Sequence, residues 1–537
     1  MTKRLCLILL LLVVISACVQ TQPTPLPTQT TIPTLVSKPA TPWWREAVFY
    51  EIFVRSFYDT NSDGIGDFNG ITSKLDYLQH LGITAIWLMP IHPSPSYYGY
   101  DVLNYYAVNP EYGTMTDFKR LLSEAHKRNM HIIIDLVLNH TSDQHPFFKD
   151  ALRGPHSKYH EWYVWSDSDQ GRGWHAVTDD QQTYYFGQFC ECMPDLNYRN
   201  PAVTAQMENV VKYWLEDVGV DGFRVDAAKH LIEEGQKIEH TKATHEWLKG
   251  FFQVYKADQP NAYTVGEVYG ADASLAKTYT GNQLDEVFNF EVASGILNSV
   301  NGGSNAGVNS ALTFAIQGFP DGDYATFLTN HDQNRVMSVL NGDLAKAKLV
   351  AFLLLTSPGV PFIYYGEEIG MQGEKPDELI RTPMQWISDK GAGFTSGTPW
   401  EQINSDFTTV NVAKQTGDST SLLEHYRKLI QLRNAHSALS VGTTYVVDSK
   451  SNKLASYLRA SQDEIILTVT NLGDQPVTDY GLDLEKGPLS GNYTAKSLLD
   501  DVAISPLQAN KTGGFNAYTP LPEIPPYGTL IAQLTRK

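Results

Sequence analysis

The sequence predicts an α/β protein: a (β/α)8 TIM barrel with an inserted domain B after strand 3 and a C-terminal all-β (β-sandwich) domain. Three observations support this prediction. Short apolar segments alternate with helical patterns from Trp43 onward, one long segment interrupts the alternation, and the pattern changes to strands and turns from about residue 436. A chain of 537 residues has room for a barrel of about 250 residues or more and for further domains.

The strands of the predicted barrel are near-continuous apolar runs. Such runs are typical of parallel sheets, whose two faces are both buried. A count of eight, with helices between most of them, indicates that the sheet closes into a barrel. The predicted strands span residues 47–54, 83–90, 131–138, 220–226, 263–268, 286–290, 324–330 and 361–365.

The intervening helices are predicted from apolar residues at helical spacing and from their end signals. The first stops at Gly82, and the second has Thr116 as a candidate N-cap. The expected helices span residues 71–82, 116–129, 201–217, 242–257 and 344–355.

The interruption spans residues 139–196 and is rich in His, Trp, Tyr and Asp. A connection this long is either functional or a small domain of its own. We therefore assign residues 43–138 and 197–435 to the barrel (domain A) and 139–196 to the insertion. The C-terminal β domain (domain C) takes residues 436–537, with strand patterns at 443–449, 453–460, 464–472 and 528–535.

The N-terminus has the pattern of an export signal. Lys3 and Arg4 precede an apolar run, Leu5–Ile15, that is too short to span a membrane. The run ends in small residues before Cys18, which resembles the bacterial lipoprotein cleavage box. This resemblance implies a signal peptide at 1–17, a lipid on Cys18, and attachment to the extracytoplasmic side of the bacterial cell membrane. The alternative is an ordinary signal peptide with a chance cysteine.

Residues 19–42 carry six Pro and seven Thr and read as an extended tether, so that 18–42 forms the anchor segment. The net charge of −18 argues against nucleic acid and against a polybasic membrane surface. The membrane contact is therefore expected through the lipid alone, and we expect a monomer.

Four cysteines are present, and two of them fall in the N-terminal segment as Cys6 and Cys18. Cys190 and Cys192 are one residue apart, a spacing that rarely meets disulfide geometry. We therefore expect no disulfide between them. We also expect no zinc site, because there is no second pair.

Charged residues follow several of the predicted strands, where a parallel barrel places its active site. Asp135 ends the third strand, Arg224 and Asp226 end the fourth, and Glu267 ends the fifth. His331 and Asp332 follow the seventh, and Asn139-His140 come just after the third. One such end could be a structural ion pair, but several on one rim indicate function.

Two carboxylates on either side of a glycosidic bond can hydrolyse it. The nucleophile must stay ionised, and Arg224 on the same strand face would stabilise that form of Asp226. Glu267 would serve as acid and base, with a raised pKa. Asp332 would hold sugar hydroxyls and favour the distorted ring, and His140 and His331 would donate hydrogen bonds to the same sugar.

Seven segments resemble the α-amylase family of glycoside hydrolases (family 13). They are "YYGYD" (97–101), "DLVLNH" (135–140), "MPDLN" (193–197), "GFRVDAAKH" (222–230), "GEVY" (266–269), "FLTNHD" (327–332) and "RTPMQW" (381–386). The resemblance covers about residues 45 to 435. It implies that Asp226 is the nucleophile, Glu267 the acid/base and Asp332 the transition-state stabiliser, with Tyr100 stacking under the cleaved sugar.

The segment "DTNSDGIGD" (59–67) places oxygen ligands at alternating positions and resembles the start of an EF-hand loop. Family members bind Ca²⁺ at this loop, and the expected ligands are Asp59, Asn61, Asp63, the Ile65 carbonyl and Asp67. The alternative is a polar turn without metal. A second Ca²⁺ site is implied at Asn139, Asp195 and the carbonyl of His230.

The substrate prediction rests on finer resemblances. Lys229 and His230 after the nucleophile resemble α-amylases, in which this pair contacts the leaving-group side of an α-1,4 chain. Other segments resemble those of oligoglucosidases and neopullulanases: "MPDLN", the calcium loop and "TPMQW". We expect an enzyme that acts on starch and maltodextrins. The alternatives are an α-glucosidase, an oligo-1,6-glucosidase or neopullulanase-like enzyme, and a surface protein that binds glucan without cleaving it.

Overall fold

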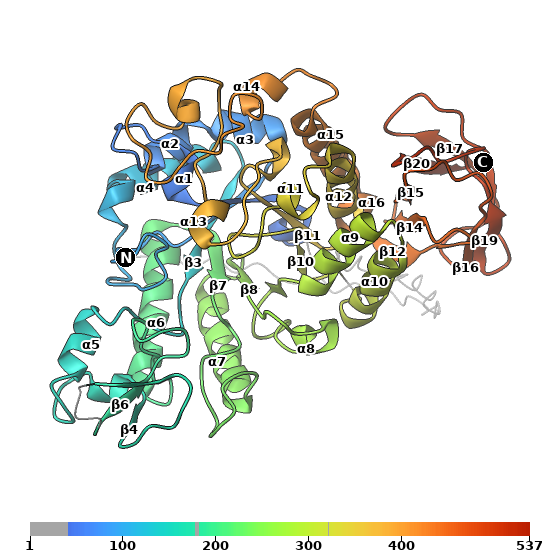
Figure 1. The fold of residues 1–537 in the computed structure, drawn as a ribbon. Coiled ribbons are helices and arrows are strands. Elements are labelled where there is room, and N and C mark those ends of the chain that lie inside the picture. The colour runs from blue at the N-terminus through green and yellow to red at the C-terminus, as the bar shows by residue number, and fades with distance from the viewer. Residues whose placement is uncertain (1–40, 178–181, 321) are drawn as a thin grey trace, which may run out of the picture. The chain divides into compact units, whose positions relative to one another are not determined.

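Eight parallel strands form the central sheet of the computed structural model, which describes residues 41–177, 182–320 and 322–537 (Figure 1). The sheet order is β10-β11-β1-β2-β3-β7-β8-β9, and a parallel bridge from Phe288 to Ala325 joins its two edges. The predicted closed barrel is therefore confirmed. Its strands are β1 (Phe49–Ile52), β2 (Ala85–Leu88), β3 (His131–Leu136), β7 (Gly222–Val225), β8 (Tyr263–Gly266), β9 (Glu286–Val287), β10 (Ala325–Thr326) and β11 (Val360–Tyr364).

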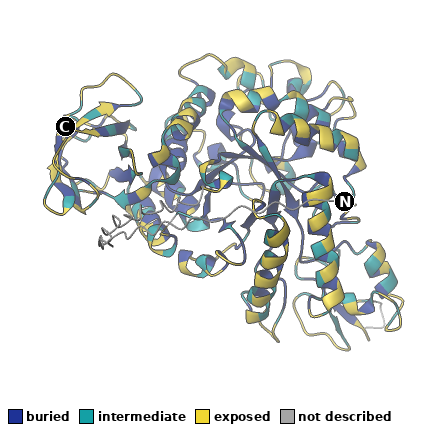
Figure 2. Cartoon of the chain, turned by 180° about the vertical axis from the view of Figure 1, so that it is seen from behind, coloured by how far each residue is buried: buried dark blue, intermediate teal, exposed yellow. Residues whose placement is uncertain are grey.

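Helices surround this sheet, and Figure 2 shows exposed residues on their outer sides and buried residues on the sides towards the sheet. The helices of the barrel are α2 (Phe68–Ser73), α3 (Leu75–Leu81), α4 (Met115–His126), α6 (Pro201–Lys212), α7 (Lys242–Asp258), α8 (Ala273–Lys277), α9 (Phe290–Gly302), α10 (Ala306–Gly318), α12 (Leu344–Thr356) and α15 (Leu422–Ala435). Shorter helices are α1 (Val54–Phe57), α11 (Val336–Val339), α13 (Asp377–Ile380), α14 (Val412–Gln415) and α16 (Ser437–Val441).

Two predicted helix ends differ in detail. The N-cap of α4 is Thr114 and not Thr116: Thr114 and Asp117 form a capping box. The prediction of Thr116 was wrong because the reciprocal partner, Asp117, lies three residues after Thr114. The predicted helix at 201–217 is observed as α6 followed by a π-helical segment, Tyr213–Val218, which ends at Gly219 in a left-handed conformation.

Aromatic and aliphatic side chains fill the inside of the barrel. Phe49 and Phe362 stack there with ring centroids 4.2 Å apart, beside Trp87 and Phe288. Towards the carboxyl ends of the strands this apolar layer gives way to charge. Arg224 lies with its guanidinium carbon 5.3 Å from the centroid of the Trp87 ring. The apolar layer therefore supports the charged groups described below.

Residues 139–196 fold as a small unit between β3 and α6. It contains α5 (Pro146–Ala151) and a three-stranded sheet of β4 (Trp165–Ser166), β5 (Trp174–Ala176) and β6 (Tyr184–Phe186). Cys190 and Cys192 form a disulfide in this segment, so the expectation of unpaired cysteines was wrong. A turn, closed by the Met193 amide donating to the Cys190 carbonyl, brings their Cα atoms to 5.2 Å.

The C-terminal residues form antiparallel sheets around a hydrophobic core of their own. The six-stranded sheet has the order β12-β14-β15-β20-β17-β18, and the three-stranded sheet has the order β13-β16-β19. Their bounds are β12 (Thr443–Val446), β13 (Asp448–Ser449), β14 (Leu454–Ala460), β15 (Ile465–Asn471), β16 (Leu482–Lys486), β17 (Asn492–Ser497), β18 (Leu507–Gln508), β19 (Gly513–Tyr518) and β20 (Thr529–Arg536).

The predicted signal peptide and Cys18 lie outside the described residues. In the part of the chain that is described, no helix combines the length and apolarity that a membrane crossing requires.

Candidate active site

Arg224 is the centre of the candidate site. Its side chain is buried, and its register on β7 places it beside Asp135 of β3. Nη1 lies 2.9 Å from Asp135 Oδ1 and 2.5 Å from Asp226 Oδ1, and Nη2 lies 2.8 Å from Glu267 Oε2. One guanidinium therefore holds carboxylates from the ends of three neighbouring strands.

Asp226 and Glu267 follow β7 and β8, which are paired in the sheet. Besides its bond to Arg224, Glu267 Oε2 accepts from the Ala227 amide at 3.3 Å. Burial raises the pKa of Asp226 to about 8; Arg224 opposes the shift, and the charges of Glu267 and Asp135 add to it. In the free protein Asp226 therefore retains its proton near neutral pH. The expectation that Arg224 keeps Asp226 ionised was wrong, because burial and the neighbouring carboxylates outweigh the guanidinium.

Asp332 lies in a different environment. Its Oδ1 accepts from Arg381 Nη2 at 3.0 Å, and its Oδ2 lies 3.2 Å from His331 Nε2. Burial would raise the pKa of Asp332, but the charges of His331, Arg381 and Arg224 hold it below its usual value. Near neutral pH, Asp332 is therefore ionised and Asp226 is protonated.

His331 connects the two sides of the site. Its Nδ1 lies 2.6 Å from Glu51 Oε1 on β1, and its Nε2 lies 2.7 Å from the Tyr100 hydroxyl. Tyr100 also donates to Asp135 Oδ2 at 3.2 Å. These contacts fix the Tyr100 ring, which stacks beside the imidazole with an interplanar angle of 15°.

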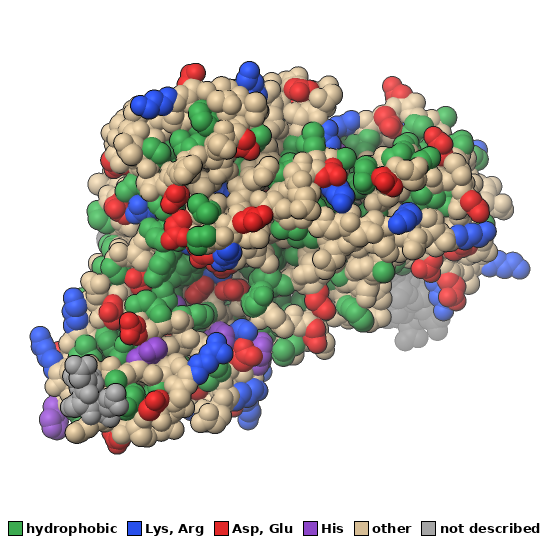
Figure 3. Space-filling model, in the orientation of Figure 1, with side chains coloured by type: hydrophobic (Ala, Val, Ile, Leu, Met, Phe, Trp, Pro, Cys, Tyr) green, Lys and Arg blue, Asp and Glu red, His purple; other side chains and the backbone are tan. Residues whose placement is uncertain are grey.

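A cavity of about 300 Å³ opens over these groups. On the face drawn in Figure 3, acidic side chains gather in a hollow among hydrophobic ones. The residues that line the cavity are Tyr98, Tyr100, His140, Phe189, Met193, Asp226, Ala227, Glu267, Asp332, Asp377 and Arg381. The structure thus brings the three predicted acids, Tyr100 and His140 to one cavity.

Four predicted substrate contacts are not among the residues that line this cavity: Arg224, Lys229, His230 and His331. Arg224 and His331 are buried and contact the lining acids Asp226 and Asp332. Lys229 Nζ lies 2.6 Å from Glu239 Oε2, and His230 bonds the Ile238 carbonyl through Nδ1 at 3.1 Å. His230 approaches the cavity through Phe189, whose ring contacts those of His140 and His230. Burial lowers the pKa of His140 to about 4, so this imidazole is neutral.

Sequence reasoning did not pick out Glu51, Asp377 or Arg381 as site residues. Arg381 opens the segment "RTPMQW", which offered a signal, and α13 brings Asp377 beside it at 3.0 Å. Glu51 lies in an apolar strand and is 280 residues away from His331 in the sequence. A charged residue inside such an apolar run could have indicated a site residue.

The predicted metal ligands lie in two places. In the loop 59–67, Asp59 accepts from the amides of Asn61, Ser62 and Gly64, and the Asn61 amide group donates to Asp63. Asp67 accepts from Thr60 and caps α2 through the Gly70 amide. Among the described residues, no group of three or more His, Cys, Asp or Glu side chains is arranged to hold a metal ion.

At the second place, Asn139 and Asp195 lie on adjacent backbone segments. His140 and Asp195 form a β-bridge, and the Leu196 amide donates to the Asn139 carbonyl at 2.8 Å. Asn139 Oδ1 and Asp195 Oδ2 are buried and have no hydrogen-bond partner among the described residues. Burial raises the pKa of Asp195 well above its usual value.

Comparison with known proteins places the chain in a family. The family model "Alpha amylase, catalytic domain" matches residues 51–442. The sequence is 40% identical to Alpha-amylase 3 of Dictyoglomus thermophilum, over 80% of this chain and 85% of that protein. It is 33% identical to an oligo-1,6-glucosidase of Parageobacillus thermoglucosidasius, over 87% of this chain and 98% of that protein.

The crystal structure of an alpha-amylase from H. orenii superposes with a TM-score of 0.78 at 37% identity, covering 91% of this chain and 99% of that one. An eight-stranded parallel barrel whose strand ends place acids around one cavity is the architecture of a barrel enzyme with its active site at the carboxyl ends of the strands. The chain belongs to the alpha-amylase family of glycoside hydrolases.

Proposed function

We propose that this protein hydrolyses α-1,4-glucosidic bonds in starch, maltodextrins and related α-glucans. We propose that it retains the anomeric configuration and cleaves bonds in the interior of the glucan. The observation that carries the proposal is the shared guanidinium of Arg224, which holds Asp226 through Nη1 and Glu267 through Nη2. Two carboxyl groups tied to one side chain are close enough to flank a single linkage. Retaining enzymes need the two about 5–5.5 Å apart.

In the first step, Asp226 attacks the anomeric carbon while Glu267 gives its proton to the leaving glycosidic oxygen. A covalent glycosyl ester forms on Asp226 and the shortened chain departs. Glu267 then takes a proton from water, which attacks the same carbon and releases Asp226. Asp226 attacks as the carboxylate, so the proton that burial holds on it up to about pH 8 in the free protein leaves before the first step, an ionisation that Arg224 favours.

Asp332 and Tyr100 are proposed to shape the reacting sugar. Asp332, held ionised by Arg381 and His331, accepts hydrogen bonds from sugar hydroxyls and favours the distorted ring. The Tyr100 ring offers the sugar a flat apolar face. Neutral His140 lines the cavity and is proposed to donate a hydrogen bond to the same sugar. His331 is proposed to donate through Nε2, which contacts Tyr100 and Asp332 in the free protein.

The linkage preference separates this proposal from its main alternative. Relatives named alpha-amylase support α-1,4 cleavage, and relatives named oligo-1,6-glucosidase favour an α-glucosidase, oligo-1,6-glucosidase or neopullulanase-like enzyme. Lys229 is engaged by Glu239, so its proposed contact with the leaving-group side requires that pair to open. A surface protein that binds glucan without cleaving it is disfavoured, because all three acids line one cavity.

We propose Ca²⁺ at the loop 59–67 as a structural ion. The donor set fits: carboxylates, an amide and a carbonyl are the hard oxygen ligands that Ca²⁺ takes. Three of these ligands are the carboxylates of Asp59, Asp63 and Asp67, which accept hydrogen bonds within the loop in the described structure and would have to turn towards the ion. A second Ca²⁺ is proposed at Asn139, Asp195 and the His230 carbonyl, where two buried side-chain oxygens lack partners. At both places the ion would neutralise carboxylate charge and tie loops together.

The N-terminal segment supports a proposal about location. We propose that Cys18 carries a lipid and that the Pro- and Thr-rich segment to residue 42 tethers the enzyme, as a monomer, to the outer side of the bacterial cell membrane.

The experiment that tests the function uses Asp226→Asn. The variant should lose release of reducing ends from soluble starch by more than about 10⁴-fold, because no nucleophile remains. Asp463→Asn, which changes an exposed carboxylate in the C-terminal domain, is the matched control. Products from maltoheptaose, pullulan and isomaltose then decide linkage and mode of attack. Full activity of Asp226→Asn would refute the assignment.

A further inference from the structure

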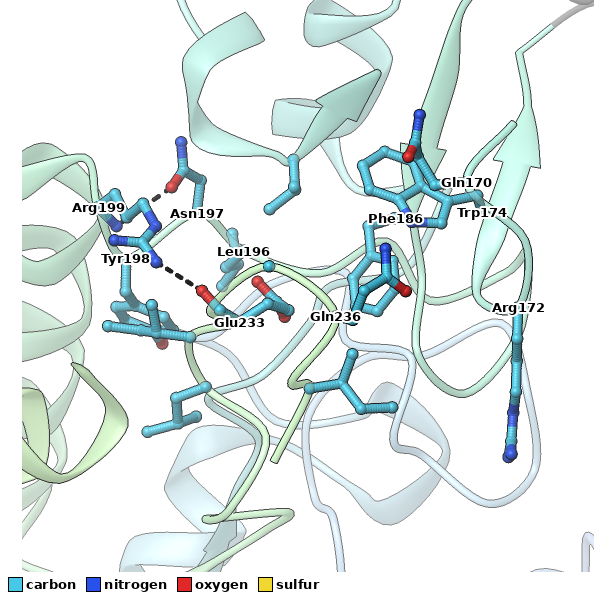
Figure 4. A pocket seen from close by; sticks show the side chains of 15 residues that line it. Gln170, Arg172, Trp174, Phe186, Leu196, Asn197, Tyr198, Arg199, Glu233 and Gln236 are labelled. Carbon is cyan, nitrogen blue, oxygen red and sulfur yellow. Dashed lines mark hydrogen bonds between the residues drawn. The ribbon is translucent and has the colours of Figure 1, made fainter. Parts of the chain in front are cut away.

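A second, larger cavity of about 390 Å³ lies away from the acids. Figure 4 shows it between the insertion, which contributes Gln170, Trp174 and Phe186, and the loop after β7, which contributes Glu233 and Gln236. It shares no lining residue with the candidate active site. Its volume lies in the range of pockets that hold small ligands.

The cavity has an aromatic wall over an apolar floor. The Trp174 and Phe186 rings lie 5.4 Å apart at an angle of 55°, and Trp174 is only partly buried. Leu196, Leu231 and Ile232 are buried beneath. An indole that is partly exposed over an apolar floor offers a stacking face for the flat, apolar side of a sugar ring.

The rim carries polar groups without partners. The Glu233 carboxylate and the Gln236 amide have no hydrogen bond or ion pair to another residue in the described part of the chain. Burial raises the pKa of Glu233 to about 7, and the charge of Arg199 opposes this shift. Arg199 is held beside it by donating to the Glu233 carbonyl (Figure 4).

The wall formed by the loop after β7 is fixed in place. The Ile232 carbonyl accepts from the Thr241 hydroxyl at 2.5 Å, and the Ile232 amide donates to the Thr244 hydroxyl at 3.0 Å. Glu234 and Lys237 exchange backbone hydrogen bonds of 2.8 and 3.2 Å. A wall held in this way needs little ordering when a ligand enters.

We propose that this cavity is an accessory site that binds one or two glucosyl units of an α-glucan chain outside the catalytic cavity. Trp174 supplies the stacking face, and Glu233 and Gln236 accept and donate hydrogen bonds with sugar hydroxyls. Arg172 and Arg199 add donors to the lining beside the acceptor Glu233, a mixture that suits the hydroxyls of a sugar. Among the described residues that line the cavity, Glu233 is the only carboxylate, too few for Ca²⁺, which takes six to eight oxygens.

This inference rests on the proposed function, since the accessory site takes the same polymer that the active site cleaves. A chain held at the second site raises the local concentration of glucan near the acids. The effect should therefore appear with long substrates and be absent with short ones.

The test uses Glu267→Gln, which slows hydrolysis so that maltoheptaose survives a calorimetric titration. We expect two binding sites in Glu267→Gln, one in Glu267→Gln with Trp174→Ala, and two again with Trp174→Phe, which keeps a ring. Phe314→Ala, which removes an exposed ring that lines neither cavity, is the control and should retain both sites. Melting temperatures show that each variant is folded.

In the active enzyme, Trp174→Ala should lower kcat/KM on soluble starch by about 2- to 5-fold and leave maltotriose hydrolysis unchanged. The inference is overturned if Glu267→Gln binds maltoheptaose at a single site, or if the double variant Glu267→Gln, Trp174→Ala still binds at two. Either result leaves the hydrolytic activity of the wild type unaffected. Failure of the proposed function would be recognised separately, because the wild-type enzyme would then cleave no maltodextrin.

Discussion

Arg381 donates to Asp332 through Nη2 at 3.0 Å and to the His331 carbonyl through Nε at 2.9 Å. This single side chain therefore positions the carboxylate and the backbone segment that carries it. Because Arg381 is almost fully buried, its charge acts on Asp332 with little screening by solvent.

Arg381→Ala should lower kcat/KM on maltodextrins by about 10²-fold or more, since Asp332 loses both its orientation and a charge that keeps it ionised. The pKa of Asp332 should rise, so the acid limb of the pH profile should move to higher pH. Arg381→Lys keeps the charge and should retain part of the activity. A pH profile unchanged in Arg381→Ala would contradict this role.

Asp226→Asn should stabilise the fold in a pH-dependent way. The folded pKa of about 8 lies above the unfolded value of about 3.9, so the folded state alone binds a proton between these limits. Stability of the wild type therefore falls as pH rises from about 4 to about 8, and this penalty is fully present above 8.

The asparagine variant does not titrate and escapes the penalty. Its melting temperature should exceed that of the wild type by a margin that grows from pH 5 to pH 8 and then levels off. Thermal unfolding followed by circular dichroism at several pH values checks this. A margin independent of pH would show that burial of Asp226 is not the source of the effect.

Removal of Ca²⁺ should destabilise the protein. Chelator treatment should lower the melting temperature by several degrees, because an ion that binds only the folded loop 59–67 adds its binding free energy to the stability of the fold. Asp63→Ala should melt lower than the wild type and show a smaller response to chelator. Asp463→Ala, in a turn of the C-terminal domain, is the control; equal chelator responses in both variants would exclude the loop.

Cys18→Ser should release the protein from the membrane fraction of a bacterial host that attaches lipids to exported proteins. The reason is that the small residues before Cys18 resemble a lipoprotein cleavage box, so a lipid on its sulfur is the proposed attachment. Fractionation with immunodetection checks this, and Cys6→Ser serves as the matched control. Persistent membrane association of Cys18→Ser would refute the anchor.

The chain alone was enough to predict the barrel and its acids. Eight apolar runs mark strands buried on both faces, and polar residues at their carboxyl ends must meet at one rim. Asp226, Glu267 and Asp332 could therefore be located by counting strands, because the connectivity of a parallel barrel fixes which ends converge. Their ordered segments also carried the resemblance to the family.

Tertiary structure decided what the pattern could not express. Glu51 and Arg381 reach His331 and Asp332 from distant segments, and a contact across the barrel leaves no periodic trace in either segment. The Cys190–Cys192 disulfide depends on a turn, and the pairing of Lys229 with Glu239 depends on a loop path. Hydrophobic periodicity determines which face of an element is buried, whereas loop conformation and long-range partners are fixed only when the packed chain brings separate segments together.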